Sequence, residues 1–194
     1  MSRENILNEV RKNQPALSPL PTIEVAIPDQ NTWLEVLKER LEFLHVSVYE
    51  VANEAEIISL LSQSIEIKDR VVTTIPALNS VATYIESVSE DAHNLENVEL
   101  AIIPAHFAVA ENGAMWITDS IIKYRVLPFI TQQLAVVVKK SDLVYNMHQA
   151  YSKIANTNYD FGVFIAGPSK TADIEQSLVL GAHGPKGMKV FIMG

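Results

Sequence analysis

Runs of consecutive apolar residues, many of them β-branched, recur along this chain and alternate with stretches of helical period. The runs lie at 70–75, 99–105, 133–138, 161–167 and 188–193, and residues 45–51 alternate as a further strand does. Uninterrupted apolar runs of this length are typical of strands that are buried on both faces, as in a parallel sheet covered by helices. Strands alternating with helices indicate an α/β fold. We therefore predict a largely parallel sheet flanked by helices, in one domain over residues 32–194.

Helices are expected between these runs. Thr32 and Glu35 have the spacing of a capping box, which predicts a helix that begins at Thr32. Further predicted helices begin at Asn53 and cover 79–90, 141–155 with Ser141 as N-cap, and 171–180.

The first residues are predicted to form a separate unit. Ser2 can cap a short helix that ends near Asn13, and the stretch after it carries Pro15, Pro19, Pro21 and Pro28. Prolines at that density prevent a continuous helix. Residues 1–31 are thus read as a helix and a proline-rich arm outside the core.

One passage, residues 106–119, departs from the alternation of strands and helices. It reads as a strand, the pair Asn112-Gly113, and a second strand, and Asn-Gly between apolar runs is a strong hairpin signal. Glu111 precedes this turn, where its carboxylate is either a nucleophile or general base, or a solvated loop side chain. His106 and Trp116 flank it on the two strands.

The closing stretch, residues 167–194, combines glycines, prolines, hydroxyls and charges. Gly167 follows an apolar run, Ser169 and Thr171 are candidate caps, and Lys170 adds a positive charge. One reading is a ligand-binding loop at the carboxyl end of a strand, with His183 and the more distant Arg125 as further candidates; the other is a capped helix between two strands.

The loop at Gly167–Thr171 and the turn at Glu111–Gly113 are hypothesised to face one shared cleft. Asp173 and Glu175 would oppose a phosphate, so a small organic acid is the expected ligand.

Composition excludes several classes of function. The formal net charge is −8 and basic runs do not exceed two residues, which argues against nucleic-acid binding. There are no cysteines, so the chain has no disulfides and no thiolates for zinc or iron–sulfur clusters. The five histidines have no metal-site spacing. No signal peptide or apolar run of membrane-spanning length is seen, and a cytoplasmic location is expected.

Several of these motifs resemble one family. "GPSKTADIEQSLVLGAHGP" is similar to the closing signature of the lactate-utilisation protein C family, also called LUD-domain proteins. "AENGAMWITDS" resembles that family's hairpin, "RVLPFITQQLAVVV" its approach to a central strand, and "MSRENILNEVRK" its opening helix. This chain has Asn112 where threonine is usual and Ala114 where a small hydroxyl residue is common, and residues 76–97 match no pattern of the family.

The resemblance implies a fold similar to the sugar-isomerase and CoA-transferase superfamily, and a role in oxidising L-lactate to pyruvate with iron–sulfur partner subunits. Oxidation needs an electron acceptor, and a chain without cysteine or a dinucleotide fingerprint is expected to leave that chemistry to its partners. The first hypothesis is therefore a non-redox subunit of a lactate-oxidising complex that binds no cofactor. The alternative is a stand-alone transferase or isomerase that uses Glu111.

Overall fold

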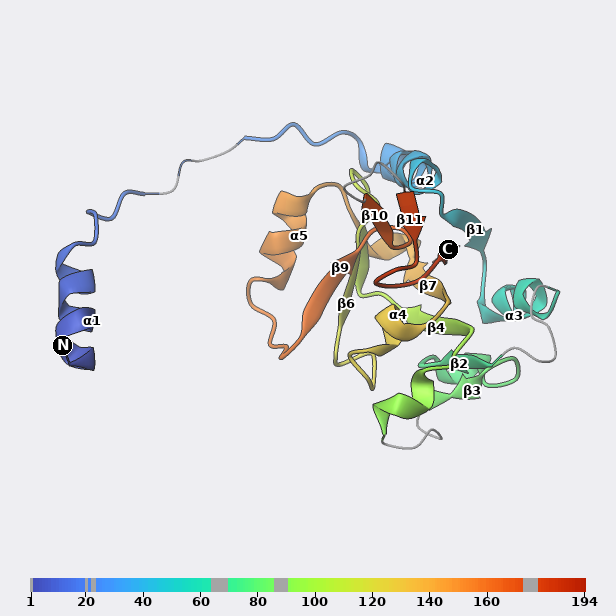
Figure 1. Ribbon diagram of the computed structural model, residues 1–194. Coiled ribbons are helices and arrows are strands. Elements are labelled where there is room, and N and C mark those ends of the chain that lie inside the picture. Colours follow the sequence, from blue (N-terminus) through green and yellow to red (C-terminus); the bar gives the residue numbers. More distant parts are fainter. Residues whose placement is uncertain (1, 20, 22–23, 64–69, 86–90, 173–177) are drawn as a thin grey trace.

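The computed structural model describes residues 2–19, 21, 24–63, 70–85, 91–172 and 178–194 (Figure 1). Six strands of this part of the chain form one parallel sheet in the order β1-β12-β7-β4-β2-β3. Their bounds are Ser47–Val51 (β1), Val71–Thr73 (β2), Thr83–Tyr84 (β3), Leu100–Pro104 (β4), Gln133–Lys139 (β7) and Gly187–Met193 (β12). The predicted α/β architecture with a largely parallel sheet is confirmed.

Helices cover both faces of this sheet, as a parallel sheet requires. Helix α2 (Trp33–Phe43) buries Leu37 and Leu41 in one core cluster, to which α4 (Leu127–Ile130) also contributes Leu127. Helix α3 (Glu54–Ser62) buries its apolar residues in a separate cluster on the opposite face. The alternation along each strand decides which cluster a side chain joins, since successive residues point to opposite faces.

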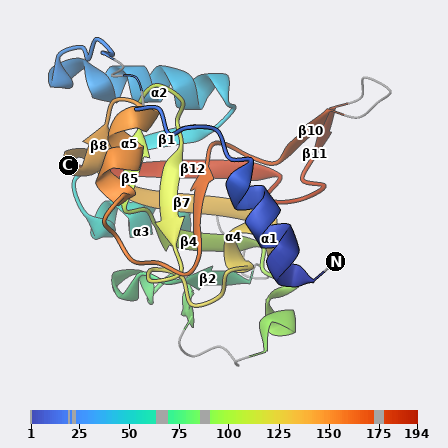
Figure 2. The same ribbon diagram turned by 90° about the vertical axis from the view of Figure 1, so that its left-hand side faces the viewer.

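A second sheet lies against the first and has the order β8-β5-β6-β9. Its strands are Phe107–Val109 (β5), Met115–Thr118 (β6), Leu143–Val144 (β8) and Gly162–Ile165 (β9). In Figure 2 a yellow strand of this second sheet crosses in front of β12, β7 and β4 of the parallel sheet. One face joins the main core through Ala108 and Met115, and the other packs Phe107 and Trp116 under helix α5 (Met147–Ile154).

The inserted hairpin is confirmed, with a longer turn than the sequence suggested. Phe107 pairs with Trp116 in antiparallel register, and the backbone N–H of Val109 donates to the carbonyl of Ala114 at 2.8 Å. Gly113 has a φ of 73°, whereas Asn112 does not adopt a positive φ. The Asn112 side chain instead accepts a hydrogen bond from Ala114 N at 3.0 Å.

The predicted helix at 171–180 is wrong where the structure describes it. Residues Lys170–Ala172 (β10) pair with Leu178–Leu180 (β11) as an antiparallel ribbon, and residues 173–177 lie outside the described residues. The ribbon gives backbone partners to both short segments, whereas an isolated helix of this length is marginal. The run at 161–167 also differs, because β9 joins the second sheet antiparallel to β6.

Two other predicted helix starts need correction, and a third begins where predicted without the expected capping bond. The helix predicted over residues 79–90 is not seen in the described part of that range. A 3₁₀ turn (Pro76–Leu78) precedes it, strand β3 lies within it, and residues 86–90 lie outside the description. In 141–155, a 3₁₀ turn (Lys140–Asp142) and β8 come first, and Asn146 rather than Ser141 caps α5 by accepting from Gln149 N at 2.9 Å. Helix α2 has Thr32 as its N-cap residue, as predicted, but Thr32 also ends a 3₁₀ turn (Gln30–Thr32) that Asp29 caps. Its hydroxyl donates to the carbonyl of Asp29 at 2.7 Å and makes no capping bond to the helix. A further 3₁₀ turn covers Ala92–Leu95.

The predicted caps of the other two helices are confirmed. Ser2 accepts a hydrogen bond from Asn5 N at 3.3 Å at the start of α1 (Arg3–Lys12), and Asn53 accepts one from Glu56 N at 3.2 Å at the start of α3. Helix α1 stands at the end of an extended arm, away from the sheets (Figure 1). It buries no residue, and its apolar side chains Ile6 and Val10 are 51% and 55% exposed.

Separability of this arm stays a prediction. We expect deletion of residues 2–27 to shift the melting temperature of the remaining protein by less than about 2 °C, since surface changes that remove no buried contact have small effects. Pro28 is retained because its carbonyl accepts a hydrogen bond from the Trp33 indole at 3.1 Å. Differential scanning calorimetry of the truncated and full chains provides the test, and a loss of more than about 5 °C would show that the arm belongs to the core.

Candidate functional site

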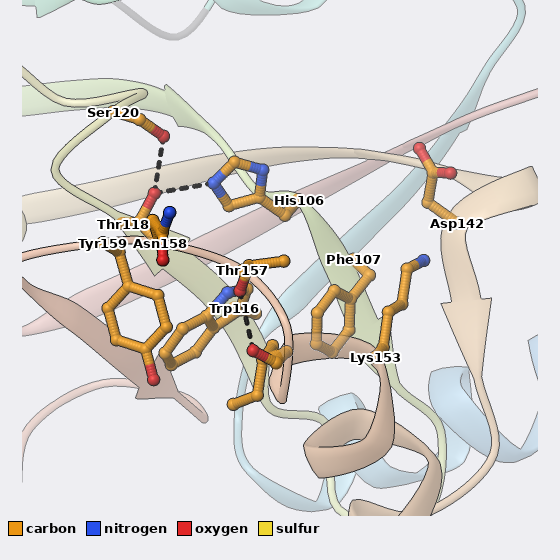
Figure 3. Close-up of a pocket in the computed structure, with 11 residues that line it drawn as sticks. His106, Phe107, Trp116, Thr118, Ser120, Asp142, Lys153, Thr157, Asn158 and Tyr159 are labelled. Atoms are coloured by element: carbon orange, nitrogen blue, oxygen red, sulfur yellow. Dashed lines mark hydrogen bonds between the residues drawn. The ribbon is translucent and has the colours of Figure 1, made fainter.

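The candidate site, here called the His106 pocket, opens beside the corner where β4 leads into β5. It has a volume of about 280 Å³ (Figure 3). Strands β5 and β6 supply its inner wall, and α5 with the chain that follows it supplies the outer wall. The lining residues are His106, Phe107, Trp116, Thr118, Ser120, Asp142, Lys153, Ile154, Thr157, Asn158 and Tyr159.

Aromatic rings make up the apolar wall of the pocket. The Trp116 ring meets Tyr159 edge-on with centroids 5.2 Å apart, and Phe107 stacks beside Trp116 at 6.4 Å. Gly162 makes room for this arrangement, because a Cβ atom there would lie 2.3 Å from Trp116 Cη2. The wall is therefore formed by packing across β5, β6 and β9.

The polar wall is a chain of hydroxyls that ends at an imidazole. His106 Nε2 lies 2.7 Å from Thr118 Oγ1, which lies 2.7 Å from Ser120 Oγ (Figure 3). Thr118 is buried, at 4% exposure, whereas Ser120 is exposed. If Ser120 donates to Thr118 and Thr118 donates to Nε2, the remaining proton of His106 sits on Nδ1, which points away from Thr118.

Burial lowers the pKa of His106, and the charge of Lys153 lowers it further. The imidazole is therefore neutral at pH 7, so it can either donate through Nδ1 or accept a proton. The ammonium of Lys153 lies 4.9 Å from the centre of the Phe107 ring, at the rim of the pocket. Asp142 lies at the opposite edge of the opening from Thr118 in Figure 3.

This arrangement suits a small organic acid. Lys153 offers the positive charge for a carboxylate, His106 offers a donor or acceptor to an adjacent hydroxyl or carbonyl oxygen, and the aromatic wall covers the carbon atoms. The hydroxyl chain can also move a proton between the imidazole and Ser120 at the surface.

The structure assigns Glu111 a contact at the start of a helix. Glu111 is exposed at the hairpin tip, and its Oε1 accepts a hydrogen bond from Met147 N, the first residue of α5, at 2.7 Å. The carboxylate thereby satisfies an N–H group that has no partner within the helix. A catalytic role for Glu111 stays a prediction.

Two substitutions separate capping from catalysis at this position. We expect Glu111→Ala to lower the free energy of unfolding by about 1 kcal/mol, the usual effect of losing an N-terminal cap, and Glu111→Gln to retain most of it because the amide oxygen still accepts. Urea denaturation measures both. If the protein has an enzymatic activity and the Gln variant loses it while its stability stays normal, Glu111 has a catalytic role. Unchanged stability of the Ala variant would contradict the capping role.

The closing stretch lies at the other end of the parallel sheet. Ser169 N donates to the carbonyl of Pro185 at 2.8 Å, and His183 N donates to Ser169 Oγ at 3.4 Å. Lys170 Nζ lies 3.4 Å from His45 Nδ1, just before β1 begins. Thr171 lies in β10, so neither hydroxyl residue caps a helix as expected.

Leu44 brings the hairpin tip and the closing stretch together. A Cβ on Gly113 would lie 3.1 Å from Leu44 Cδ1, and one on Gly167, whose φ is 83°, would lie 3.2 Å from Leu44 Cβ. The two turns hypothesised to share a cleft are thus neighbours at the amino ends of the strands, not at the carboxyl ends where the His106 pocket lies. Ligand binding by Asn112, Gly113, Gly167, Ser169, Lys170, Thr171 and His183 stays a prediction.

Arg125 lies apart from the hairpin tip and the closing stretch. Its guanidinium donates to Asp119 at 2.8 Å and lies 3.9 Å from a carboxylate oxygen of Asp160, beyond the end of β6. It therefore lies on the side of the His106 pocket, where its role as a ligand-binding residue also stays a prediction.

Sequence reasoning named His106 and Trp116 only as neighbours of the turn, and missed the rest of the pocket. One signal was the hairpin, whose register sets Phe107 opposite Trp116 and therefore His106 opposite Ile117, but the contact of His106 with Thr118 does not follow from that register. Lys153 and Tyr159 carry no such signal, because their place depends on how α5 packs on the second sheet. Within the described ranges, no three or more acidic, histidine or cysteine side chains are grouped as metal ligands, and no helix is long and apolar enough to cross a membrane.

Comparisons with known proteins agree on one family. The LUD domain family matches residues 76–193. A lactate utilization protein C of Anoxybacillus flavithermus is 28% identical over 172 residues, which cover 80% of this chain and 78% of that protein. Another, of Geobacillus kaustophilus, is 34% identical over 101 residues, 49% of this chain and 41% of the relative. A crystal structure of a duf162 family protein from Deinococcus radiodurans has a similar fold, with a TM-score of 0.68 at 16% identity, covering 87% of this chain and 100% of that one.

Proposed function

Because the chain belongs to the LUD domain family, we propose that it serves lactate utilisation as a cytoplasmic, non-redox subunit that binds a small organic acid. The names of its relatives, lactate utilization protein C, support the pathway. The His106 pocket carries the binding part of the proposal.

The His106 pocket has room for a small organic acid. Its volume of about 280 Å³ is just below the range of pockets that hold drug-sized ligands. Lys153 would pair with the carboxylate, and His106 would hydrogen-bond the oxygen on the neighbouring carbon. That pairing distinguishes 2-hydroxy and 2-oxo acids from simple carboxylates, since the imidazole has no ligand oxygen to bond when the second oxygen is missing.

Electron transfer would take place on other chains. Converting a 2-hydroxy acid to a 2-oxo acid removes two electrons and two protons, which requires a redox cofactor. A chain without cysteine cannot supply thiolates to an iron–sulfur cluster. We therefore assign the clusters to partner subunits, and to this chain the binding of the acid and the acceptance of a proton by His106.

Calorimetric titration of L-lactate and pyruvate into the full chain tests the binding role. We expect saturable binding of at least one acid, about tenfold weaker binding by His106→Ala, which removes one hydrogen bond to the ligand, and unchanged binding by His93→Ala. His93 is a matched control because its side chain is 92% exposed and contacts Asp91. No saturable binding of either acid would overturn the binding role.

Affinity purification of the tagged full chain from its own cells tests the partners. We expect cysteine-rich iron–sulfur proteins to co-purify, and deletion of the gene to stop growth on L-lactate while growth on pyruvate continues. Normal growth on L-lactate after deletion would overturn the role in lactate utilisation.

A further inference from the structure

His106 leaves one ring nitrogen for a ligand, because the protein holds the other. Its Nε2 lies 2.7 Å from Oγ1 of Thr118, the last residue of β6 (Figure 3). Thr118 is only 4% exposed, so this contact is part of the packed wall of the pocket. Nδ1 points away from Thr118 and has no hydrogen-bond partner among the described residues. The ring nitrogen available to a ligand is therefore Nδ1.

The hydrogen bonds that hold Nε2 can run in either direction. A hydroxyl both donates and accepts, and Thr118 Oγ1 lies 2.7 Å from Ser120 Oγ as well as from Nε2. In one direction Ser120 donates to Thr118 and Thr118 donates to Nε2, so the ring proton is on Nδ1. In the other direction Nε2–H donates to Thr118 and Thr118 donates to Ser120, so Nδ1 has a free lone pair. Both hydrogen bonds are kept in either case.

Reversal of this chain of hydroxyls needs only water at its outer end. Ser120 is exposed, so water can pass a proton to its hydroxyl while Ser120 passes its own proton to Thr118 and Thr118 passes one to Nε2. The proton on Nδ1 then leaves to water, and the imidazole is neutral before and after. One proton enters and one leaves, and the buried hydroxyl of Thr118 has its partners in both states.

The two acids of the proposed function make opposite demands on Nδ1. The oxygen of a 2-oxo group only accepts hydrogen bonds, so it needs a proton on Nδ1. The hydroxyl of a 2-hydroxy acid carries the proton that His106 would accept, and this requires a free lone pair on Nδ1. A ring fixed in one tautomer would suit only one of the two acids, whereas a reversible chain suits both.

We propose that Thr118, with Ser120 behind it, is the positioning residue that lets His106 match either acid: the ring proton is on Nε2 when L-lactate is bound and on Nδ1 when pyruvate is bound. The inference rests on the proposed function and adds to it the residues that set the hydrogen-bonding direction of the site. Thr118 acts through the imidazole, whereas His106 and Lys153 contact the acid. One histidine thereby recognises both the reduced and the oxidised acid.

Heteronuclear NMR of the ring nitrogens reads the tautomer directly, in the full chain with isotope-labelled histidines at about pH 8, above the usual histidine pKa. His106→Ala identifies the signals of this ring. We expect Nε2–H to predominate with saturating L-lactate and Nδ1–H with saturating pyruvate. The same tautomer in both complexes would overturn the inference and leave the proposed binding standing. If neither acid binds saturably, the proposed function fails, and the inference fails with it.

Substitutions at Thr118 test whether its hydroxyl is responsible. In Thr118→Val a proton on Nε2 would face a methyl group and lose its acceptor, which is unfavourable for an N–H group. We therefore expect Nδ1–H in both complexes, with L-lactate bound about tenfold more weakly and pyruvate changed by less than about threefold. Thr118→Ser retains the hydroxyl, so it should restore the affinity and the response of the tautomer to the acid.

Thr83→Val is the matched control, because Thr83 is an exposed residue of β3, and it should bind both acids as the unchanged chain does. If the tautomer in Thr118→Val still follows the acid as it does in the unchanged chain, Thr118 does not set it and the inference is wrong. Melting temperatures show whether each variant is folded. If Thr118→Val does not fold, the two complexes of the unchanged chain still decide.

Discussion

Replacing Lys153 by methionine is expected to weaken the binding of a small organic acid to this protein by about thirtyfold, without unfolding it. The ammonium at the rim of the His106 pocket is the positive charge that we assign to the carboxylate, and losing a charged partner of this kind weakens binding by roughly tenfold to a thousandfold. Lys153 is exposed, which places the expected loss in the lower half of that range, and methionine retains much of the aliphatic packing on Phe107.

The same substitution has a second consequence that a merely structural lysine would not produce. The charge of Lys153 contributes to lowering the pKa of His106, after burial. Removing it should therefore raise that pKa toward the usual value for histidine, which an NMR titration of the ring protons measures directly. Lys12→Met is the matched control, because Lys12 lies on α1. Acid affinity that does not change in Lys153→Met would contradict the role of this lysine even if the pKa of His106 moves.

Apolar patterning predicted most of the fold. The runs at 70–75, 99–105 and 133–138 became neighbouring strands β2, β4 and β7, because an uninterrupted apolar run is favourable only where both faces are covered. The hairpin was predictable for a similar local reason, since Gly113 permits the positive φ that its turn needs.

The errors arose where local and tertiary preferences compete. The stretch 171–180 has residues that suit a helix, yet its described ends pair with each other as strands, a choice that depends on contacts outside the segment. The run at 161–167 correctly predicted a strand, but no property of the run itself says which sheet it joins. Register with β6 decides that.

The candidate site was harder to predict than the fold for the same reason. The sequence motifs indicated turn residues as site candidates, because glycine and asparagine are typical of special backbone geometry. In the structure, Gly113 and Gly167 lie where a side chain would come close to Leu44. The His106 pocket instead unites residues from β5, β6, α5 and the chain after α5. Side chains that converge only after two layers pack leave no spacing in the sequence.

The second large effect is expected at Gly162, which packs against the Trp116 ring. Gly162→Ala should lower the free energy of unfolding by about 3 kcal/mol, the upper part of the range for overpacking a core. An added Cβ would lie 2.3 Å from Trp116 Cη2 and 2.6 Å from Cζ2. The indole cannot easily move away, because it is only 5% exposed and packs on Phe164 with ring centroids 4.6 Å apart. Thermal denaturation should show a fall of roughly 10 °C, and binding in the His106 pocket should weaken because Trp116 forms its wall.

A double-mutant cycle tests whether that steric conflict is the cause. Phenylalanine at position 116 lacks the distal ring atoms that the new Cβ would meet, so Gly162→Ala should lower the stability of a Trp116→Phe protein by less than about 1 kcal/mol. Gly194→Ala is the matched control, since a Cβ there would have its nearest neighbour, the carbonyl oxygen of Val51, at 4.0 Å. If Gly162→Ala is equally destabilising with either residue at 116, the loss comes from the backbone of β9 and the wall of the pocket does not depend on this glycine. If the two effects are strongly non-additive, Gly162 is present because the pocket needs a full indole at Trp116, which links one small residue in a strand to the shape of the candidate site.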